Sequence, residues 1–185
     1  MRIVGVLLAS LVLTIAVHAQ EKVNELSWQD TRGKVQRLGD YKGKIVVLNF
    51  WATWCEGCRH EMPLLAKMQE KYADKGLVVL GGSVDDATTQ SSITPFGEQN
   101  KIPFPLLVGA TTEQMHRLQL GEAIPATAFI DTEGKVVARV LGELDKSDFQ
   151  HRIEWMLGKH SGKEPPPFVD GFKKKAEPQP SPFSH

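Results

Sequence analysis

The sequence predicts an α/β fold in which a mixed central sheet is flanked by helices. Apolar, β-branched runs typical of buried strands alternate with segments whose apolar residues recur at helical spacing. The predicted order is hairpin, β, α, β, α, β, α, β, β, α, which favours an α/β sandwich with a mixed sheet. A length of 185 residues suits one domain with extensions at its ends.

The predicted strands are short and are separated by turn residues. The clearest is the run 44–51, which is almost continuously apolar and therefore fits a strand covered on both faces. Turns at 30–33 and 131–134 each end in glycine and predict two hairpins. In order, strands are predicted at 26–28, 34–38, 44–51, 77–84, 104–108, 126–131 and 135–141.

Helical spacing accounts for most of the chain between these strands. The longest predicted helix follows Cys58 and stops at Gly76, with Pro63 near its first turn, where proline costs least. A short helix is predicted in the polar stretch 85–100, and a brief one before Gly121. The remaining predicted helix begins at Asp145 and ends at Gly158.

The N-terminus predicts export. Arg2 precedes the apolar run 3–17, which fits a signal-peptide core and is shorter than the roughly 20 residues that span a bilayer. Residues 1–19 are therefore interpreted as a signal peptide cleaved after Ala19, and the alternative is an uncleaved anchor. Both interpretations place the domain outside the cytoplasm, in the periplasm or secreted.

Charge and composition define the other two segments. The chain carries 22 basic and 22 acidic residues, so electrostatics give no reason to expect nucleic acid, or a membrane beyond an uncleaved N-terminus. Residues 20–158 form the predicted domain. Residues 159–185 hold six of the eleven prolines together with Lys173, Lys174 and Lys175, which predicts a disordered Pro/Lys-rich tail. A docking segment for a partner is the alternative.

The two cysteines form a C-x-x-C motif between a predicted strand and a predicted helix. If Cys55 opens the helix, Cys58 lies about one turn later and their sulfurs fall within bonding range. A purely structural disulfide gains little here, since closing four residues gives roughly 2 kcal/mol against about 3 kcal/mol for fifteen. We therefore predict a pair that opens and closes.

Three neighbouring residues are predicted to tune this pair. The helix N-terminus and the N–H groups of Gly57 and Cys58 favour a thiolate, whereas the charge of Glu56 opposes it. A higher thiol pKa favours the disulfide, which is the direction of a reductant. Glu61, three residues after Cys58, is predicted either to exchange a proton with that thiol or to act as a first-turn acid stabilising the helix.

A metal site is the competing interpretation of the same cysteines. Two thiolates bind Cu(I), and a third ligand would come from His60 or His116. The sequence holds no second C-x-x-C and no H-x-x-x-H to complete a zinc site. We therefore predict no metal and no cofactor, with a copper carrier as the alternative.

Across 49–58 (NFWATWCEGC) and 124–127 (IPAT) the sequence resembles the thioredoxin superfamily, and within it the exported TlpA/ResA-like thiol-disulfide oxidoreductases. The resemblance covers residues 23–158. It implies a thioredoxin-like fold with an N-terminal β-hairpin and a central α/β insertion, the latter consistent with the 67 residues that separate Cys58 from Pro125.

The resemblance also assigns roles within the motif. Cys55 is the attacking thiol, Cys58 the resolving thiol, and Trp54 a flank of the active surface. Pro125 is expected to be cis and to face the cysteines, while Ile124 offers its backbone to the substrate.

The sequence departs from the family pattern at two positions. Asn49 stands where cytoplasmic-type thioredoxins have a buried aspartate, which leaves Glu61 as the proton acceptor. Gly57 stands where many relatives have proline.

These observations predict an exported enzyme that reduces disulfides of partner proteins and depends on a membrane thiol electron donor. Apocytochrome c is a substrate that relatives serve. A thiol peroxidase is the second enzymatic interpretation, although Thr53 stands only two residues before Cys55, whereas the P-x-x-x-T-x-x-C pattern places its threonine three before. A module that binds partners through its tail is the third.

Overall fold

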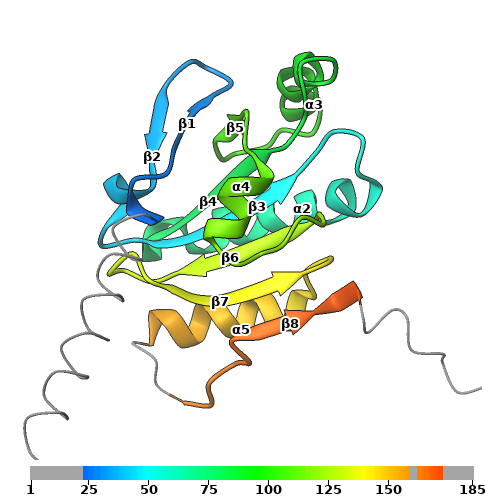
Figure 1. Cartoon of the computed structure of the whole chain (residues 1–185). Helices are drawn as coiled ribbons and strands as arrows, with labels where there is room; N and C mark the ends of the chain where they lie inside the picture. The colour runs from blue at the N-terminus through cyan, green and yellow to red at the C-terminus, as the bar shows by residue number, and fades with distance from the viewer. Residues whose placement is uncertain (1–22, 159–161, 173–185) are drawn as a thin grey trace, which may run out of the picture.

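The computed structural model describes residues 23–158 and 162–172, and it builds them around one mixed sheet with helices on both faces (Figure 1). The strands are β1 Ser27–Asp30, β2 Val35–Arg37, β3 Ile45–Trp51, β4 Leu77–Ser83, β5 Leu106–Val108, β6 Ala126–Ile130, β7 Val136–Leu141 and β8 Phe168–Asp170. The α-helices are α2 Glu56–Tyr72, α3 Ile93–Gln99, α4 Thr112–Arg117 and α5 Lys146–Leu157. Short 3-10 turns occur at η1 Leu38–Tyr41, η2 Ala73–Lys75 and η3 Gln90–Ser92.

The strand order confirms the predicted mixed sheet. It runs β2-β1-β5-β4-β3-β6-β7-β8 within the described residues. Central β3 pairs in parallel with β4 and antiparallel with β6, and β6 and β7 form the second predicted hairpin. The cysteine motif therefore follows a central strand.

The residues of β3 alternate between two cores because successive side chains of a strand point to opposite faces. Val47 and Trp51 pack with α2 and α5 on one face. Leu48 and Phe50 pack on the other face with Met115 of α4. Every residue of β3 is buried, as its apolar sequence predicts.

Local signals place the ends of α2. Cys55 is the N-cap, since its Sγ accepts the N–H of Cys58 at 3.2 Å. Pro63 lies inside the helix. After η2, Gly76 takes a φ of +94°, a left-handed conformation that glycine adopts without steric cost. The predicted stop at Gly76 is thus one 3-10 turn beyond the end of the α-helix.

The N-terminal hairpin is confirmed, but it does not lie apart from the main sheet. β1 pairs antiparallel with β2 and also with β5, in the register Gln29 to Val108. The hairpin therefore adds two strands to the sheet next to β5, and β2 is the edge strand of the sheet on that side.

The prediction that residues 159–185 form a disordered tail is wrong for the segment 162–172. There β8 adds to the sheet in parallel with β7, in the register Val140 to Val169. The prolines, Pro165 to Pro167, lie just before β8, where missing N–H donors cost no ladder bonds. The predicted domain boundary at residue 158 is consequently too early.

The predictions for residues 1–19 and 173–185 lie outside the described residues. Within the part of the chain that the structure does describe, no helix has the length and apolar character needed to cross a membrane.

Candidate active site

The disulfide lies where β3 ends and α2 begins. Cys55 and Cys58 are bonded, with their Cα atoms 5.3 Å apart. Cys55 is 9% exposed, whereas Cys58 is completely buried. Of the two sulfur-bearing residues, only Cys55 is therefore accessible to another molecule.

A small hollow of about 240 Å³ opens beside Cys55. The peptide bond between Ile124 and Pro125, which lies just before β6, is cis as expected. The hollow brings together the predicted site residues just before β6 and at the start of α2 with residues that follow β7 and β8. It is lined by Cys55, Gly57, Ile124, Pro125, Gly142, Glu143, Gly171 and Phe172.

Trp54 stands on the other side of the motif and is 61% exposed. A second hollow, of about 470 Å³, lies there and is lined by Trp54, Glu56, Arg59, His60, Phe96 and Asn100. The side chain of Glu56 thus points away from the cis-proline, toward His60 at 4.0 Å. Trp54 and Glu56 flank the disulfide without closing over it.

Glu61 is buried beneath the disulfide rather than solvated on the helix. Its carboxylate accepts the Asn49 side-chain N–H at 2.6 Å and the Leu144 backbone N–H at 3.0 Å. Burial raises the pKa of Glu61 to about 7, against these two hydrogen bonds, and the charge of Glu143 adds to the rise. The carboxyl is poised to change protonation near neutral pH.

The first-turn interpretation of Glu61 is wrong, because α2 begins at Glu56 and Glu61 is its sixth residue. Asn49 holds the carboxylate from β3 and also donates to Thr127 Oγ1 on β6 at 3.0 Å. The sequence identified both residues, but only the register of β3 against β6 shows that Thr127 completes the contact.

A second buried carboxylate, which sequence reasoning missed, fixes the loop before the cysteines. Asp85, after β4, accepts the Thr53 N–H at 2.9 Å, the Thr53 hydroxyl at 2.6 Å and the Ser83 hydroxyl at 2.6 Å. Burial alone would raise the pKa of Asp85, but these hydrogen bonds together lower it. The position of Asp85, directly after a buried strand parallel to β3, is the sequence signal that could have identified it.

Glu143 is the other residue that sequence reasoning missed. It follows β7 and lies against the redox turn, where a Cβ placed on Gly57 would come within 3.0 Å of its Oε1. A side chain at position 57 would therefore require the Glu143 side chain to shift. No sequence pattern links two residues this far apart.

Each of the two histidines considered as copper ligands lies beside a glutamate. His60 faces Glu56, and His116 contacts Glu122 at 3.0 Å. Among the described residues there is no group of three or more His, Cys, Asp or Glu side chains that could hold a metal ion.

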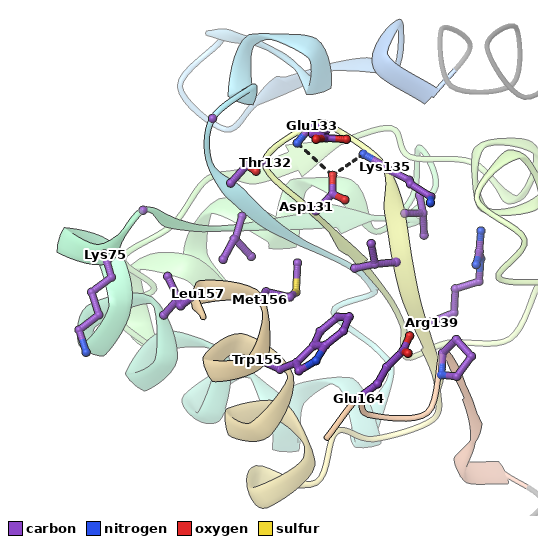
Figure 2. A pocket seen from close by; sticks show the side chains of 16 residues that line it. Lys75, Asp131, Thr132, Glu133, Lys135, Arg139, Trp155, Met156, Leu157 and Glu164 are labelled. Carbon is purple, nitrogen blue, oxygen red and sulfur yellow. Dashed lines mark hydrogen bonds between the residues drawn. The ribbon is translucent and has the colours of Figure 1, made fainter. Parts of the chain in front are cut away.

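Another hollow, of about 860 Å³, lies at the opposite end of β3, near Ile45. Figure 2 shows Trp155 turned into it from α5, beneath the β6–β7 turn. In that turn Asp131 accepts the N–H groups of Glu133 and Lys135. Since no cysteine lines it, this hollow is not the redox site.

Comparisons with known proteins agree with the geometry. A model described as the AhpC/TSA family matches residues 19–139. The thiol-disulfide oxidoreductase ResA of Bacillus cereus is 35% identical over 125 residues, which are 68% of this chain and 70% of the relative.

Two solved structures superpose on the described fold. One, from Chlorobium tepidum, is assigned as the thiol:disulfide interchange protein DsbE; it has a TM-score of 0.64 at 29% identity and covers 72% of this chain and 93% of its own. The exposed lipoprotein thioredoxin Etrx1 of Streptococcus pneumoniae has a TM-score of 0.61 at 27% identity and covers 70% and 97%.

Proposed function

We propose, from the premise that this chain belongs to the AhpC/TSA family and is a thiol-disulfide oxidoreductase of ResA type, that it reduces disulfides of partner proteins outside the cytoplasm. The observation that carries the proposal is the asymmetry of the pair. Cys55 opens into the hollow beside the cis-proline, whereas Cys58 is buried one helical turn behind it. A partner's disulfide therefore meets one sulfur first.

The reaction has two exchange steps. The Cys55 thiolate attacks one sulfur of the partner's disulfide, forming a mixed disulfide and expelling the partner's other sulfur as a thiolate. Cys58 then attacks Cys55, closes the internal disulfide and releases the partner's first sulfur. The partner gains two electrons and two protons, and the pair must be reduced again by a dithiol donor.

Glu61 is positioned to move the proton that the second step requires. The Cys58 thiol must lose a proton before it attacks, and Glu61 lies three residues later on the same face of α2. With a pKa of about 7, the carboxylate is a matched acceptor at neutral pH. Asn49 and Leu144 hold it in place.

The charges around the redox turn support the direction of a reductant. Glu143 lies against Gly57, and Glu56 occupies the first turn of α2 beside Cys55. Both carboxylates disfavour a thiolate at Cys55, which destabilises the reduced pair and lowers its reduction potential.

We further propose that residues 1–19 direct the chain out of the cytoplasm, with a membrane thiol protein as its electron donor. The apolar run after Arg2 supports export, as does the likeness to an exposed lipoprotein thioredoxin. Mass spectrometry of the exported protein is expected to find Gln20 as its first residue, and an N-terminus at Met1 would support an anchor instead.

Apocytochrome c is the first partner to test, because its haem-attachment motif also carries a cysteine pair. Reduced protein is expected to reduce an oxidised apocytochrome c faster than it reduces insulin. Equal rates would argue against cytochrome c maturation and leave the reductase proposal intact.

The decisive experiment is a redox titration of the Cys55–Cys58 couple followed by tryptophan fluorescence, since Trp54 and Trp51 lie beside the motif. Cys55→Ser is the control that should show no transition. A potential near or below about −270 mV supports a reductase, and one near about −120 mV would overturn the direction.

The same preparation tests the competing functions. Stoichiometric Cu(I) binding without disulfide exchange would favour a copper carrier. Rapid consumption of peroxide would favour a peroxidase. The structure argues against that function, because the Thr53 hydroxyl donates its hydrogen bond to Asp85. Activity that survives the Cys55→Ser, Cys58→Ser double substitution would favour a binding module.

A further inference from the structure

The segment 162–172, here called the C-terminal strap, returns from beyond α5 to the redox site. In Figure 1 it is the orange to red segment that carries β8 along the outer edge of β7. Its last described residues, Gly171 and Phe172, line the hollow that also contains Cys55 and Pro125. The family match ends at residue 139, so the strap lies beyond it.

The strap is held by hydrogen bonds to its backbone carbonyls as well as by the sheet ladder. Arg152, 1% exposed on α5, donates from Nη1 to the Pro166 carbonyl at 2.7 Å. The Arg139 N–H donates to the Pro167 carbonyl at 2.9 Å. Asp148 fixes the guanidinium of Arg152 through two hydrogen bonds, at 2.7 and 3.1 Å. A buried, doubly paired arginine indicates a fixed position for the strap.

Two glycines allow the strap to approach the end of β7 closely. A Cβ on Gly171 would lie 2.8 Å from the Leu141 carbonyl oxygen, closer than real contacts permit. Gly142 has a φ of +86°, and a Cβ there would meet the Gly171 backbone at 3.3 Å. This backbone-to-backbone contact places Phe172 at the rim of the hollow.

Phe172 is the exposed apolar residue of this rim. It is 39% exposed, and it lines the hollow together with the cis-proline and Ile124. An extended chain that brings its disulfide to Cys55 through this hollow passes Phe172. Its side chains next to the cysteine would therefore contact Phe172.

We propose that the strap is a specificity element for protein substrates, in which Phe172 binds an apolar side chain flanking the partner's cysteine. The occupant is an extended, disulfide-bearing segment of another protein. The inference rests on the proposed reductase function, since the groove is defined by access to Cys55. It adds a contact that a small disulfide cannot make.

The test compares a protein disulfide with a small one in single turnover. Reduced protein is mixed with insulin or with oxidised glutathione, and oxidation is followed by tryptophan fluorescence. For Phe172→Ala we expect the ratio of the insulin rate constant to the glutathione rate constant to fall about fivefold, as for other truncated interface aromatics. Phe172→Leu should recover most of the ratio.

Phe168→Ala is the matched control. Phe168 is 51% exposed on the same strap and does not line the hollow, so its loss should leave the ratio at the wild-type value. Gly171→Ala, which must displace the strap, should lower the ratio at least as much as Phe172→Ala.

Three results would overturn the inference. One is an unchanged ratio in Phe172→Ala, and another is an equal loss with both disulfides. The third is a wild-type dimer that Phe172→Ala dissociates, which would make a second copy the occupant. A wild-type chain that fails to reduce insulin would instead refute the proposed function, and this shows before any variant is compared.

Discussion

Two buried carboxylates lie on either side of the redox turn and differ in what their surroundings make of them. Asp85, in the loop after β4, is 4% exposed, and Glu61, on α2, is 3% exposed. The pKa of Asp85 is lowered, whereas that of Glu61 is raised to about 7. Two side chains of similar exposure therefore behave differently, since Asp85 stays charged and Glu61 titrates near neutral pH.

The difference comes from how deeply each carboxyl lies in the protein, deeper for Glu61, and from hydrogen-bond donors and neighbouring charge. Burial raises the pKa of both acids, but Asp85 receives three hydrogen bonds from Thr53 and Ser83, which together outweigh it. Glu61 receives two, and the charge of Glu143 opposes its ionisation. Asp85 thus serves as a clamp on the loop before Cys55, and Glu61 as a proton site behind Cys58.

The largest expected effect is the loss of the clamp. Asp85→Ala leaves the Thr53 N–H and two hydroxyl groups without their acceptor, so we expect the free energy of unfolding at pH 7 to fall by about 3 kcal/mol or more. Urea unfolding of the oxidised protein measures it. Asp86→Ala is the matched control: that acid is exposed and accepts hydrogen bonds from the N–H groups of Thr88 and Thr89, and a much smaller loss is expected. Equal losses of stability in Asp85→Ala and Asp86→Ala would show that Asp85 is no more important to the fold than its exposed neighbour.

The second expected effect is a pH dependence carried by Glu61. Between about pH 4.5 and pH 7 the folded oxidised protein keeps a proton on Glu61 that the unfolded chain has released. Stability therefore falls as pH rises through this range, by roughly 3 kcal/mol, and stays lower above it.

Glu61→Gln should abolish this loss. The stability of the variant relative to wild type is expected to rise by roughly 3 kcal/mol between pH 4 and pH 8, as measured by urea unfolding. Glu70→Gln, an exposed residue on the same helix, is the control and should keep the wild-type profile. If the Glu61→Gln profile also matched wild type, Glu61 would be a fixed charge like Asp85.

The sequence predicted the strands, helices and cysteine motif around these two carboxylates, but not the difference between the carboxylates. The apolar run of β3, the C-x-x-C motif and the glycine stops are local signals, and the strands and helices they predicted are confirmed. Glu61 was found because it lies one turn from Cys58. Asp85 and Glu143 were missed because strand pairing and the β7–α5 loop bring them to the motif across long separations.

β8 was missed for a related reason. Its three residues carry no strand pattern of their own and follow a run of prolines. What holds this segment is an arginine on α5 and two glycines, contacts that exist only once β7 is in place.

A smaller effect tests whether Glu143 constrains the redox turn. Alanine at position 57 should gain up to about 1 kcal/mol as a helix residue. In the wild-type background its Cβ would meet Glu143 Oε1 at 3.0 Å, so the gain should be lost, whereas in Glu143→Ala it should appear. A double-mutant cycle by urea unfolding should give a coupling of about 1 kcal/mol. Additive effects would show that the two residues do not meet.

The smallest expected effect concerns the Glu143 carboxylate, the charge that acts on Glu61 and not on Asp85. Glu143→Gln keeps the shape of the side chain but removes the carboxylate from the hollow that contains Cys55. Because a thiolate is then less disfavoured, the reduced pair gains stability and the potential should rise by about 15 mV, equivalent to about 0.7 kcal/mol.

Glu133→Gln, in the turn at the far end of the β6–β7 hairpin, is the control and should leave the potential unchanged. An electrostatic origin also requires the Glu143→Gln shift to shrink as salt is raised, since screening weakens a charge at an open site. A shift that persists in high salt would contradict an electrostatic origin.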